Sequence, residues 1–323
     1  MELNMDEIMS FIENMKESDC VGDVLVSGVA ADGYLRVVGA QTKDLVENCR
    51  KTHNMSATAT AALGRLLTGA VLMSKEMKND SDKLTIQIKG KGKIGGMAAV
   101  VRIATKDGAA GALDSVCVKG YAENPMADLP TRESDGKLDV GGIVGQGFMN
   151  VIMDLGLKEP YSGSVPLHSG EIAEDLSYYY LMSKQVPTAI SLGVLIGENL
   201  EVLQAGGYMV QLLPGAPDKL IDDIERNISY LPSVTTLLNA GASIINILQD
   251  VTRGYDLNIS EKVTCEYKCD CSKERMEEAI CSIGKDELKT IIDEDHGAEL
   301  CCHFCNNKYS FDEAELQKLY DNM

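Results

Sequence analysis

Cys269-Asp-Cys271 and, thirty residues later, Cys302-His-Phe-Cys305 are two short segments that each carry a pair of cysteines. Tetrahedral zinc is usually held by two such chelating segments, which folding brings together with Zn–S distances of about 2.3 Å. The spacing therefore predicts one Zn²⁺ per chain, bound by these four thiolates. It also predicts a small C-terminal module, residues 269–323, whose fold depends on the metal.

Three other interpretations of the cysteines stay open at this point. They are free buried side chains, iron–sulfur ligands, or, for Cys302 and Cys305, a thioredoxin-like redox pair. The last lacks the strand that precedes such a pair, and a second cysteine pair stands available. We expect Cys265, Cys281 and Cys301 not to be ligands. Cys301 could compete with its neighbour, but only Cys302 has the two-residue spacing to Cys305.

Helix and strand signals surround the four cysteines. Ser272 is expected to cap a helix that ends at Gly284, and a second helix is expected over about 286–295. After the second pair, residues 309–311 resemble a strand, and Asp312 with Glu315 forms a capping box. The inward side chains of the first helix are expected to be Met276, Ala279, Ile280 and Ile283.

The small size of the module indicates that the zinc is a switch. A segment this short buries too little apolar surface to fold securely alone. Structural zinc contributes about 10–16 kcal/mol in such modules, effectively the whole folding free energy. Zinc also keeps the sulfurs as thiolates, which is the form that oxidants attack. We therefore expect loss of zinc to unfold the module.

Before the module, the chain has mixed strands and helices without regular βαβ alternation, which predicts an α+β core domain over 1–215. Residues 1–19 are assigned to an N-terminal extension, whose apolar residues have helical spacing. Thr42 is expected to cap a helix that runs to about Lys51, and Ser56 to cap a second that runs to about Lys78. The expected strands are 24–29, 34–40, 84–89, 97–104, 112–118, 189–196 and 208–213.

A helical linker is predicted between core and module, over 216–268. Its helices are expected over 219–230 and 233–250, and Gly241 would weaken the second by about 1 kcal/mol relative to alanine. One apolar face of the second helix is expected to be docked while the module is folded. Once exposed, such a patch would bind non-native chains. The candidate client-binding residues are Leu237, Leu238, Ile244, Ile245 and Leu248.

Composition limits the partners. A formal charge of −19 over 323 residues argues against nucleic-acid and anionic-membrane binding. The start lacks the features of a secretory signal, and the most apolar run, 57–73, is interrupted by Arg65. Seven of the ten cysteines lie at or after Cys265, and a cytosolic cluster of this kind is typical of metal or redox sites. The chain is therefore expected to be cytoplasmic.

Two motifs raise enzymatic interpretations that their surroundings disfavour. Gly90-Lys-Gly-Lys-Ile-Gly95 matches a dinucleotide fingerprint, but a β-branched run rather than a helix follows it, so we expect a hairpin loop and no nucleotide. His168-Ser169 suggests a hydrolase, yet Ser169 is expected to cap a helix. We predict that the chain is not an enzyme.

The cysteine pattern, together with three core motifs, resembles the redox-regulated 33-kDa heat-shock chaperone family. The resemblance covers the chain from about Cys20 to its end. The core motifs are Pro160-Tyr-Ser-Gly-Ser-Val-Pro-Leu-His-Ser-Gly-Glu-Ile-Ala-Glu-Asp-Leu176, followed by Tyr178-Tyr179; Gln185-Val-Pro-Thr-Ala189; and Ala205-Gly-Gly-Tyr-Met-Val-Gln-Leu-Leu-Pro-Gly-Ala216.

The resemblance implies an ATP-independent holdase that is inactive while reduced and zinc-bound. It implies that oxidation forms the disulfides Cys269–Cys271 and Cys302–Cys305, releases zinc, unfolds the module and destabilises the linker. The oxidised chain would then be a homodimer that binds unfolding client proteins. Two rival functions stay open: a regulatory zinc ribbon with structural zinc, and a thiol–disulfide exchanger. Lys184, where the family commonly has an acidic residue, is a departure from the pattern.

Overall fold

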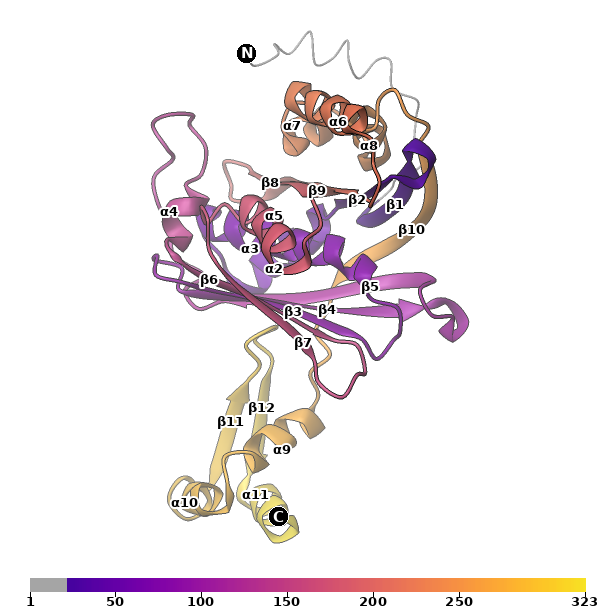
Figure 1. The fold of residues 1–323 in the computed structure, drawn as a ribbon. Coiled ribbons are helices and arrows are strands. Elements are labelled where there is room, and N and C mark those ends of the chain that lie inside the picture. Colours follow the sequence, from indigo (N-terminus) through magenta and orange to yellow (C-terminus); the bar gives the residue numbers. More distant parts are fainter. Residues whose placement is uncertain (1–21) are drawn as a thin grey trace. The chain divides into compact units, whose positions relative to one another are not determined.

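The computed structural model describes residues 22–323 and divides into two compact units, the first ending at Tyr267 and the second spanning Lys268–Met323. The expected N-terminal extension, residues 1–19, and Cys20 lie outside the described residues. Together the units form the mixed α+β structure that the sequence predicted (Figure 1).

The first unit is built on a ten-stranded sheet. Its pattern is plain in 83–90, where Leu84, Ile86 and Ile88 are buried and the residues between them are more exposed, the period of two that a strand requires. The strands are β1 (Val24–Ala30), β2 (Leu35–Gln41), β3 (Lys83–Gly90), β4 (Gly96–Thr105), β5 (Leu113–Ala122), β6 (Gly147–Asp154), β7 (Tyr161–Pro166), β8 (Thr188–Ile196), β9 (Val202–Leu212) and β10 (Asn258–Tyr267).

The strand order is β7-β6-β3-β4-β5-β10-β1-β2-β9-β8. Every neighbouring pair is antiparallel except β10 with β5, where Thr264 lies opposite Ser115 in a parallel ladder. Strand β10 therefore lies inside the sheet, between β5 and β1, although it is the last of the ten strands along the sequence. The GxGxxG motif lies at the turn between β3 and β4, as expected for a hairpin loop.

The sheet curls around α3 (Ala57–Met73), which contacts strands from both halves of the sheet (Figure 1). Ser56 caps this helix, as predicted, by accepting a hydrogen bond from the Ala59 N–H at 3.2 Å. The helix and the turn that follows, 57–76, are long and apolar enough to cross a membrane. However, 89% of the apolar window is buried inside the unit, so α3 is its central core helix.

Helix α2 (Lys43–His53) is capped differently from the prediction. Thr42 is buried and its hydroxyl hydrogen-bonds to that of Thr68 at 2.8 Å. The carboxylate of Asp23 instead accepts the N–H groups of Asp44 and Leu45. Burial raises the pKa of Asp23 to about 6, against the lowering effect of these hydrogen bonds.

At α5 (Ala173–Tyr179), too, a carboxylate takes the place of the predicted cap. The buried carboxylate of Asp175 accepts the N–H groups of His168, Ser169 and Ile172, so the prediction that Ser169 caps this helix is wrong. Asp175 therefore organises the loop that follows β7. A further short helix of the first unit is α4 (Val140–Val144).

Three helices cover the outer face of β1, β2, β9 and β8 (Figure 1). They are α6 (Asp218–Tyr230), α7 (Val234–Asn239) and α8 (Ile244–Val251). The predicted helix 233–250 is thus two helices, because Gly241 has φ +99° and forms a turn between them. Gly241 does not weaken a continuous helix. The range 216–268 also differs from a purely helical linker, because it ends in β10.

The second unit contains α9 (Lys273–Cys281), α10 (Lys285–Asp295), the hairpin β11 (Gly297–Cys301) and β12 (Lys308–Asp312), and α11 (Glu313–Asn322). The predicted Ser272 cap and the Asp312–Glu315 capping box are both present. Of the four side chains expected inside on α9, Ile280 and Met276 pack in the core, whereas Ala279 is exposed and Ile283 is 46% exposed. The fully buried apolar core is small and consists of Ile280, Leu288, Ile292, Phe311 and Leu316.

Candidate metal centre

Two turns of the second unit present the four cysteines. Cys269 and Cys271 immediately precede the Ser272 cap of α9. Cys302 and Cys305 lie in the turn between β11 and β12, where the N–H groups of Cys305 and Asn306 both donate to the Cys302 carbonyl, at 3.3 and 2.8 Å. Asn306 accommodates the sharp turn with φ +59°. The backbone therefore holds the second pair side by side.

The four Sγ atoms all lie within 4.8 Å of one another. The Sγ atoms of Cys269 and Cys302 are 3.7 Å apart, and those of Cys271 and Cys305 are 3.3 Å apart. Four sulfurs placed tetrahedrally around zinc at about 2.3 Å would be separated by about 3.8 Å. The separations are too long for disulfides, whose S–S bond is about 2.05 Å. The arrangement is that of a four-thiolate metal site.

The surroundings favour thiolate at part of this cluster. Burial raises the pKa of Cys271, but hydrogen bonds from Tyr309 and the neighbouring thiols outweigh it and lower the pKa to about 7. The Tyr309 hydroxyl lies 3.1 Å from the Cys271 sulfur. Burial raises the pKa of Cys305, and its hydrogen bonds with the neighbouring thiols raise it further. A bound cation would stabilise all four as thiolates.

The other three C-terminal cysteines are not part of the group of four. Cys265 is buried in β10 of the first unit, and burial raises the pKa of its thiol. Cys281 lies in α9. Cys301, the last residue of β11, is exposed, whereas Cys302, the first residue of the turn that follows, is buried and faces the cluster.

Sequence reasoning missed two supporting contacts. Tyr309 was treated only as a strand residue, although it donates to Cys271. Arg275, on the first turn of α9, pairs with the Asp270 carboxylate and donates to the Asp270 carbonyl at 2.8 Å, which braces the loop between the first two cysteines. The signal for Tyr309 was its distance of four residues from Cys305 across a tight turn, which returns the chain past the metal site.

The candidate client-binding residues lie in the first unit, on α7 and α8. Leu237, Ile244 and Leu248 are fully buried and Leu238 nearly so, whereas Ile245 is half-buried. Close packing is visible at Gly39 of β2, where an added Cβ would lie 2.6 Å from Ile244 Cγ1. In this state the stripe is the core contact between the helices and the sheet.

The fold and the site together define an α+β protein with a mixed sheet unit and a small unit whose four clustered cysteines are placed so that they could hold a metal ion. Residues 23–312 match the Hsp33 protein family, and the chain belongs to that family of chaperones. It is 48% identical over 297 residues to a 33 kDa chaperonin of Acetivibrio thermocellus, covering 92% of this chain and 96% of that protein. A 33 kDa chaperonin of Clostridium botulinum is 45% identical over 302 residues, covering 93% and 98%.

A solved structure is also similar. The crystal structure of a 33 kDa chaperonin, a heat shock protein 33 homologue from Thermotoga maritima, superposes with a TM-score of 0.83 at 34% identity. The similarity covers 94% of this chain and 99% of that one. The resemblance inferred from the cysteine pattern and the core motifs is confirmed.

Proposed function

We propose that this chaperone is a redox-gated holdase, which binds unfolding proteins without ATP after oxidation has removed a zinc ion. The observation that carries the proposal is the cluster of four sulfurs in a unit with only five fully buried apolar side chains among its described residues. Such a unit depends on its metal, because its own core is too small to hold it folded. Belonging to a chaperone family supplies the activity that the switch would control.

Zinc is the metal that this donor set favours. Four thiolates in a closed, tetrahedral arrangement are typical of structural zinc. The ligands would be Cys269, Cys271, Cys302 and Cys305, with one ion per chain. In functional terms we divide the chain into a core, 1–215, a linker, 216–268, and the redox module, 269–323.

Oxidation would remove the ligands in pairs. Two thiolates and one hydrogen peroxide, with two protons, give one disulfide and two waters, so two peroxides consume all four ligands and free the Zn²⁺. In the metal-bound arrangement all sulfurs are neighbours, and distance does not select a pairing. Once the module loosens, short loops close at the lowest entropic cost, which favours Cys269–Cys271 and Cys302–Cys305. Such short loops stabilise the chain little, so the module stays unfolded.

Release of the linker helices would then expose the client-binding surface. The side chains involved are those with which α7 and α8 now pack against the rest of the first unit: Leu237, Leu238, Ile244, Ile245 and Leu248. An exposed apolar patch of this kind binds non-native chains and also favours self-association, so the oxidised chain is proposed to act as a homodimer in the cytoplasm.

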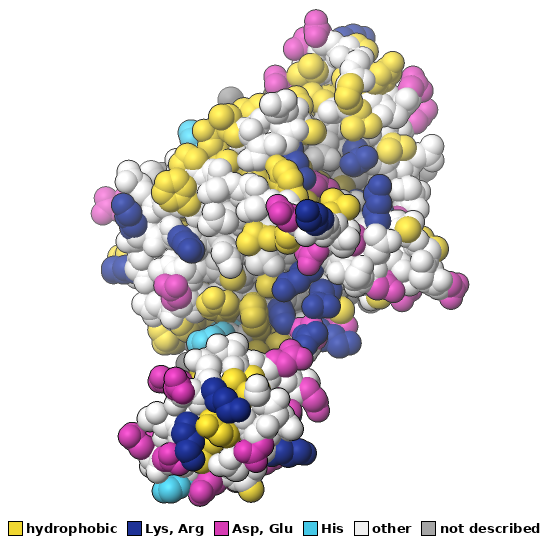
Figure 2. All heavy atoms as spheres, turned by 60° about the horizontal axis from the view of Figure 1, so that its bottom comes forward, with side chains coloured by type: hydrophobic (Ala, Val, Ile, Leu, Met, Phe, Trp, Pro, Cys, Tyr) yellow, Lys and Arg dark blue, Asp and Glu magenta, His cyan; other side chains and the backbone are white. Residues whose placement is uncertain are grey.

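The surface favours protein clients over nucleic acid or membranes. The net charge is −19, and Figure 2 shows hydrophobic side chains lying among charged ones of both signs on one face of the molecule. Phosphate-rich partners would need clustered cations. No catalytic role is proposed for any residue, and the cysteines act as ligands and redox sensors.

The test is aggregation of a heat-labile protein, with bound zinc and free thiols measured in the same samples. Peroxide-treated chain should suppress aggregation without ATP, with one zinc released, and reductant plus zinc should reverse both. Zinc release without any gain of protection would refute the switch. Catalytic reduction of a disulfide substrate would instead make the chain a thiol–disulfide exchanger.

A further inference from the structure

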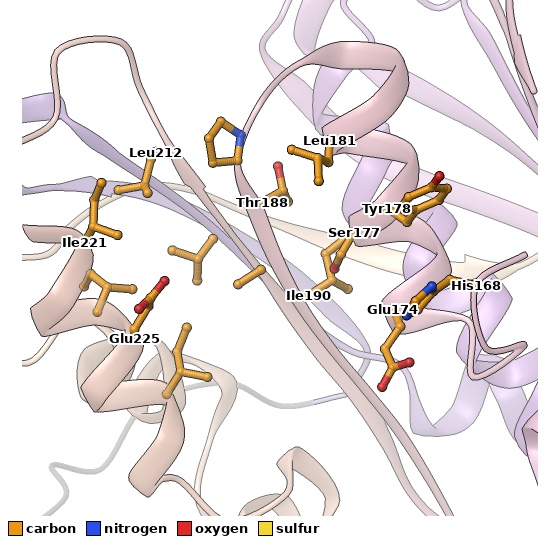
Figure 3. Close-up of a pocket in the computed structure, with 15 residues that line it drawn as sticks. His168, Glu174, Ser177, Tyr178, Leu181, Thr188, Ile190, Leu212, Ile221 and Glu225 are labelled. Carbon is orange, nitrogen blue, oxygen red and sulfur yellow. The ribbon is translucent and has the colours of Figure 1, made fainter. Parts of the chain in front are cut away.

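A cleft of about 610 Å³ opens in the first unit along the outer edge of β8 (Figure 3). Helix α5 and the π-helical turn that continues it, Tyr180–Lys184, form one wall, and α6 forms the other. Strands β8 and β9 form the floor. The walls and floor are mainly apolar and include Tyr178, Leu181, Ile190, Leu212, Ile221 and Ile228. We refer to this site as the β8-edge cleft.

The backbone of β8 offers free hydrogen-bonding groups to this cleft. The Leu212 N–H donates to the Pro187 carbonyl at 3.2 Å. Because the N–H and C=O of one residue point to the same side in an antiparallel ladder and alternate along it, Thr188, Ile190 and Leu192 direct theirs away from β9. Strand β8 is the last of the sheet order, so no described strand pairs with them. Such an edge is a template for another strand.

The accessible edge has a defined length. Residues 188–192 are half-buried, whereas Gly193 and Val194 are buried. The free part therefore spans five residues, about 17 Å of extended chain. Five residues are enough for one short strand.

The walls determine what side chains the strand must carry. On α5 and the π-helical turn that continues it, residues 174, 177, 178 and 181 follow helical spacing toward the cleft, and on α6 residues 221, 225 and 228 do the same. An added strand would place alternate side chains against Tyr178 and Leu181 on one side and Ile221 and Ile228 on the other. A strand covered on both faces is apolar at consecutive positions rather than alternate ones.

The charge of the cleft adds a second requirement. Each wall carries one carboxylate, Glu174 on α5 and Glu225 on α6, and no lysine or arginine is among the lining residues. A cationic residue next to the apolar run would therefore be attracted and an acidic one repelled.

We propose that the β8-edge cleft binds, by strand addition, an extended segment of about five consecutive apolar residues flanked by lysine or arginine. Segments of this kind are the buried central strands of other proteins and become available only when those proteins unfold. This inference rests on the proposed function and deepens it by naming a class of client segment. The cleft exists while the thiols are free, so it would bind an isolated segment weakly in the reduced chain, whereas prevention of aggregation would still require oxidation and the larger surface that release of the linker helices exposes.

The test is binding of a fluorescent peptide, Lys-Val-Ile-Val-Leu-Val-Lys, to the reduced, zinc-loaded full chain by anisotropy. The same peptide with N-methyl groups on alternate amides should bind at least about tenfold more weakly, because it cannot form the ladder to β8. Equal binding of the two peptides would overturn the proposal. Loss of binding as the chain concentration rises would also overturn it, since a second copy would then occupy the cleft.

Two matched variants locate the site. Leu181→Asp, at a side chain that is 55% exposed, should weaken binding by about tenfold or more, whereas Leu157→Asp, at one that is 69% exposed and outside the cleft, should not. Glu225→Lys leaves Glu174 opposite the new lysine and should abolish the preference for lysine-flanked over glutamate-flanked peptides. If peptide binding fails but the oxidised chain still prevents aggregation, this inference falls and the proposed function stands.

Discussion

Replacing Cys302 by serine should unfold the second unit while leaving the first intact. Cys302 is 5% exposed, and its sulfur lies 3.7 Å from that of Cys269. Serine is a poor zinc ligand, so the site would keep three thiolates and lose most of its affinity. The matched control is Cys301→Ser, which alters the neighbouring exposed thiol and none of the four ligands.

The expected magnitude follows from the small core of the unit. Its five fully buried side chains each contribute about 1.5–3 kcal/mol, and chain entropy opposes this sum. A structural zinc contributes about 10–16 kcal/mol, whereas at about 0.05–0.15 kcal/mol per residue a folded unit the length of Lys268–Met323 is stable by only about 3–8 kcal/mol. Loss of the metal therefore exceeds any net stability that this core can provide.

Amide hydrogen exchange measured by mass spectrometry suits this chain, which contains no tryptophan. Peptides from α10 and α11 should lose protection in Cys302→Ser and keep it in Cys301→Ser, while α3 stays protected in both. Bound zinc should fall in parallel in the first variant only. A zinc-free Cys302→Ser chain with native protection in α10 would refute the view that the metal holds this unit folded.

Three further predictions follow from single contacts. Tyr309→Phe removes the hydroxyl that contacts Cys271 and should lower zinc affinity about 10–100-fold, as loss of outer-shell partners does; chelator competition measures it, and unchanged affinity would count against the contact. Gly39→Val should push Ile244 and α8 off the sheet, since even a Cβ lies 2.6 Å from Ile244 Cγ1. The reduced variant should then suppress aggregation of a heat-labile protein. If α8 is displaced and the reduced variant is still inactive, the linker helices are not the client-binding surface. The folded pKa of Asp23 is raised from 3.8 to about 6, so its stabilising contribution is complete below about pH 4 and is lost as pH rises through 6. Relative to Asp23→Asn, the native chain should lose up to about 3 kcal/mol of unfolding free energy between pH 4 and 7.5. Urea denaturation measures it, and the same pH dependence of unfolding free energy in both chains would contradict this.

Local signals in the sequence were sufficient to predict that these four cysteines come together. The spacing of the four cysteines, the Ser272 cap and the Asp312–Glu315 box all act within a few residues, so they can be read without knowing the tertiary fold. The strands that alternate strongly, such as β3, were predictable for the same reason.

Long-range contacts account for what the sequence did not reveal. Asp23 caps α2 from before β1, 21 residues from the Asp44 amide that it binds. The cap of α5 is a local exception, since Asp175 lies only six residues from Ser169 and the fold of the loop decides between them. Strands β6 and β7 were missed because their apolar residues are interrupted by glycine, asparagine and serine. The acidic, polar sequence of β10 gave no strand signal, since its place between β5 and β1 is decided by neighbours far away in the chain.

The position of β10 has a consequence for synthesis. Val24 of β1 pairs with Thr264 of β10, so the ribosome must make nearly the whole first unit before the middle of the sheet can close. At about 5–20 residues per second, that interval lasts roughly ten to fifty seconds. During it the nascent protein has two unprotected strand edges, those of β1 and β5, and itself needs protection from misassembly.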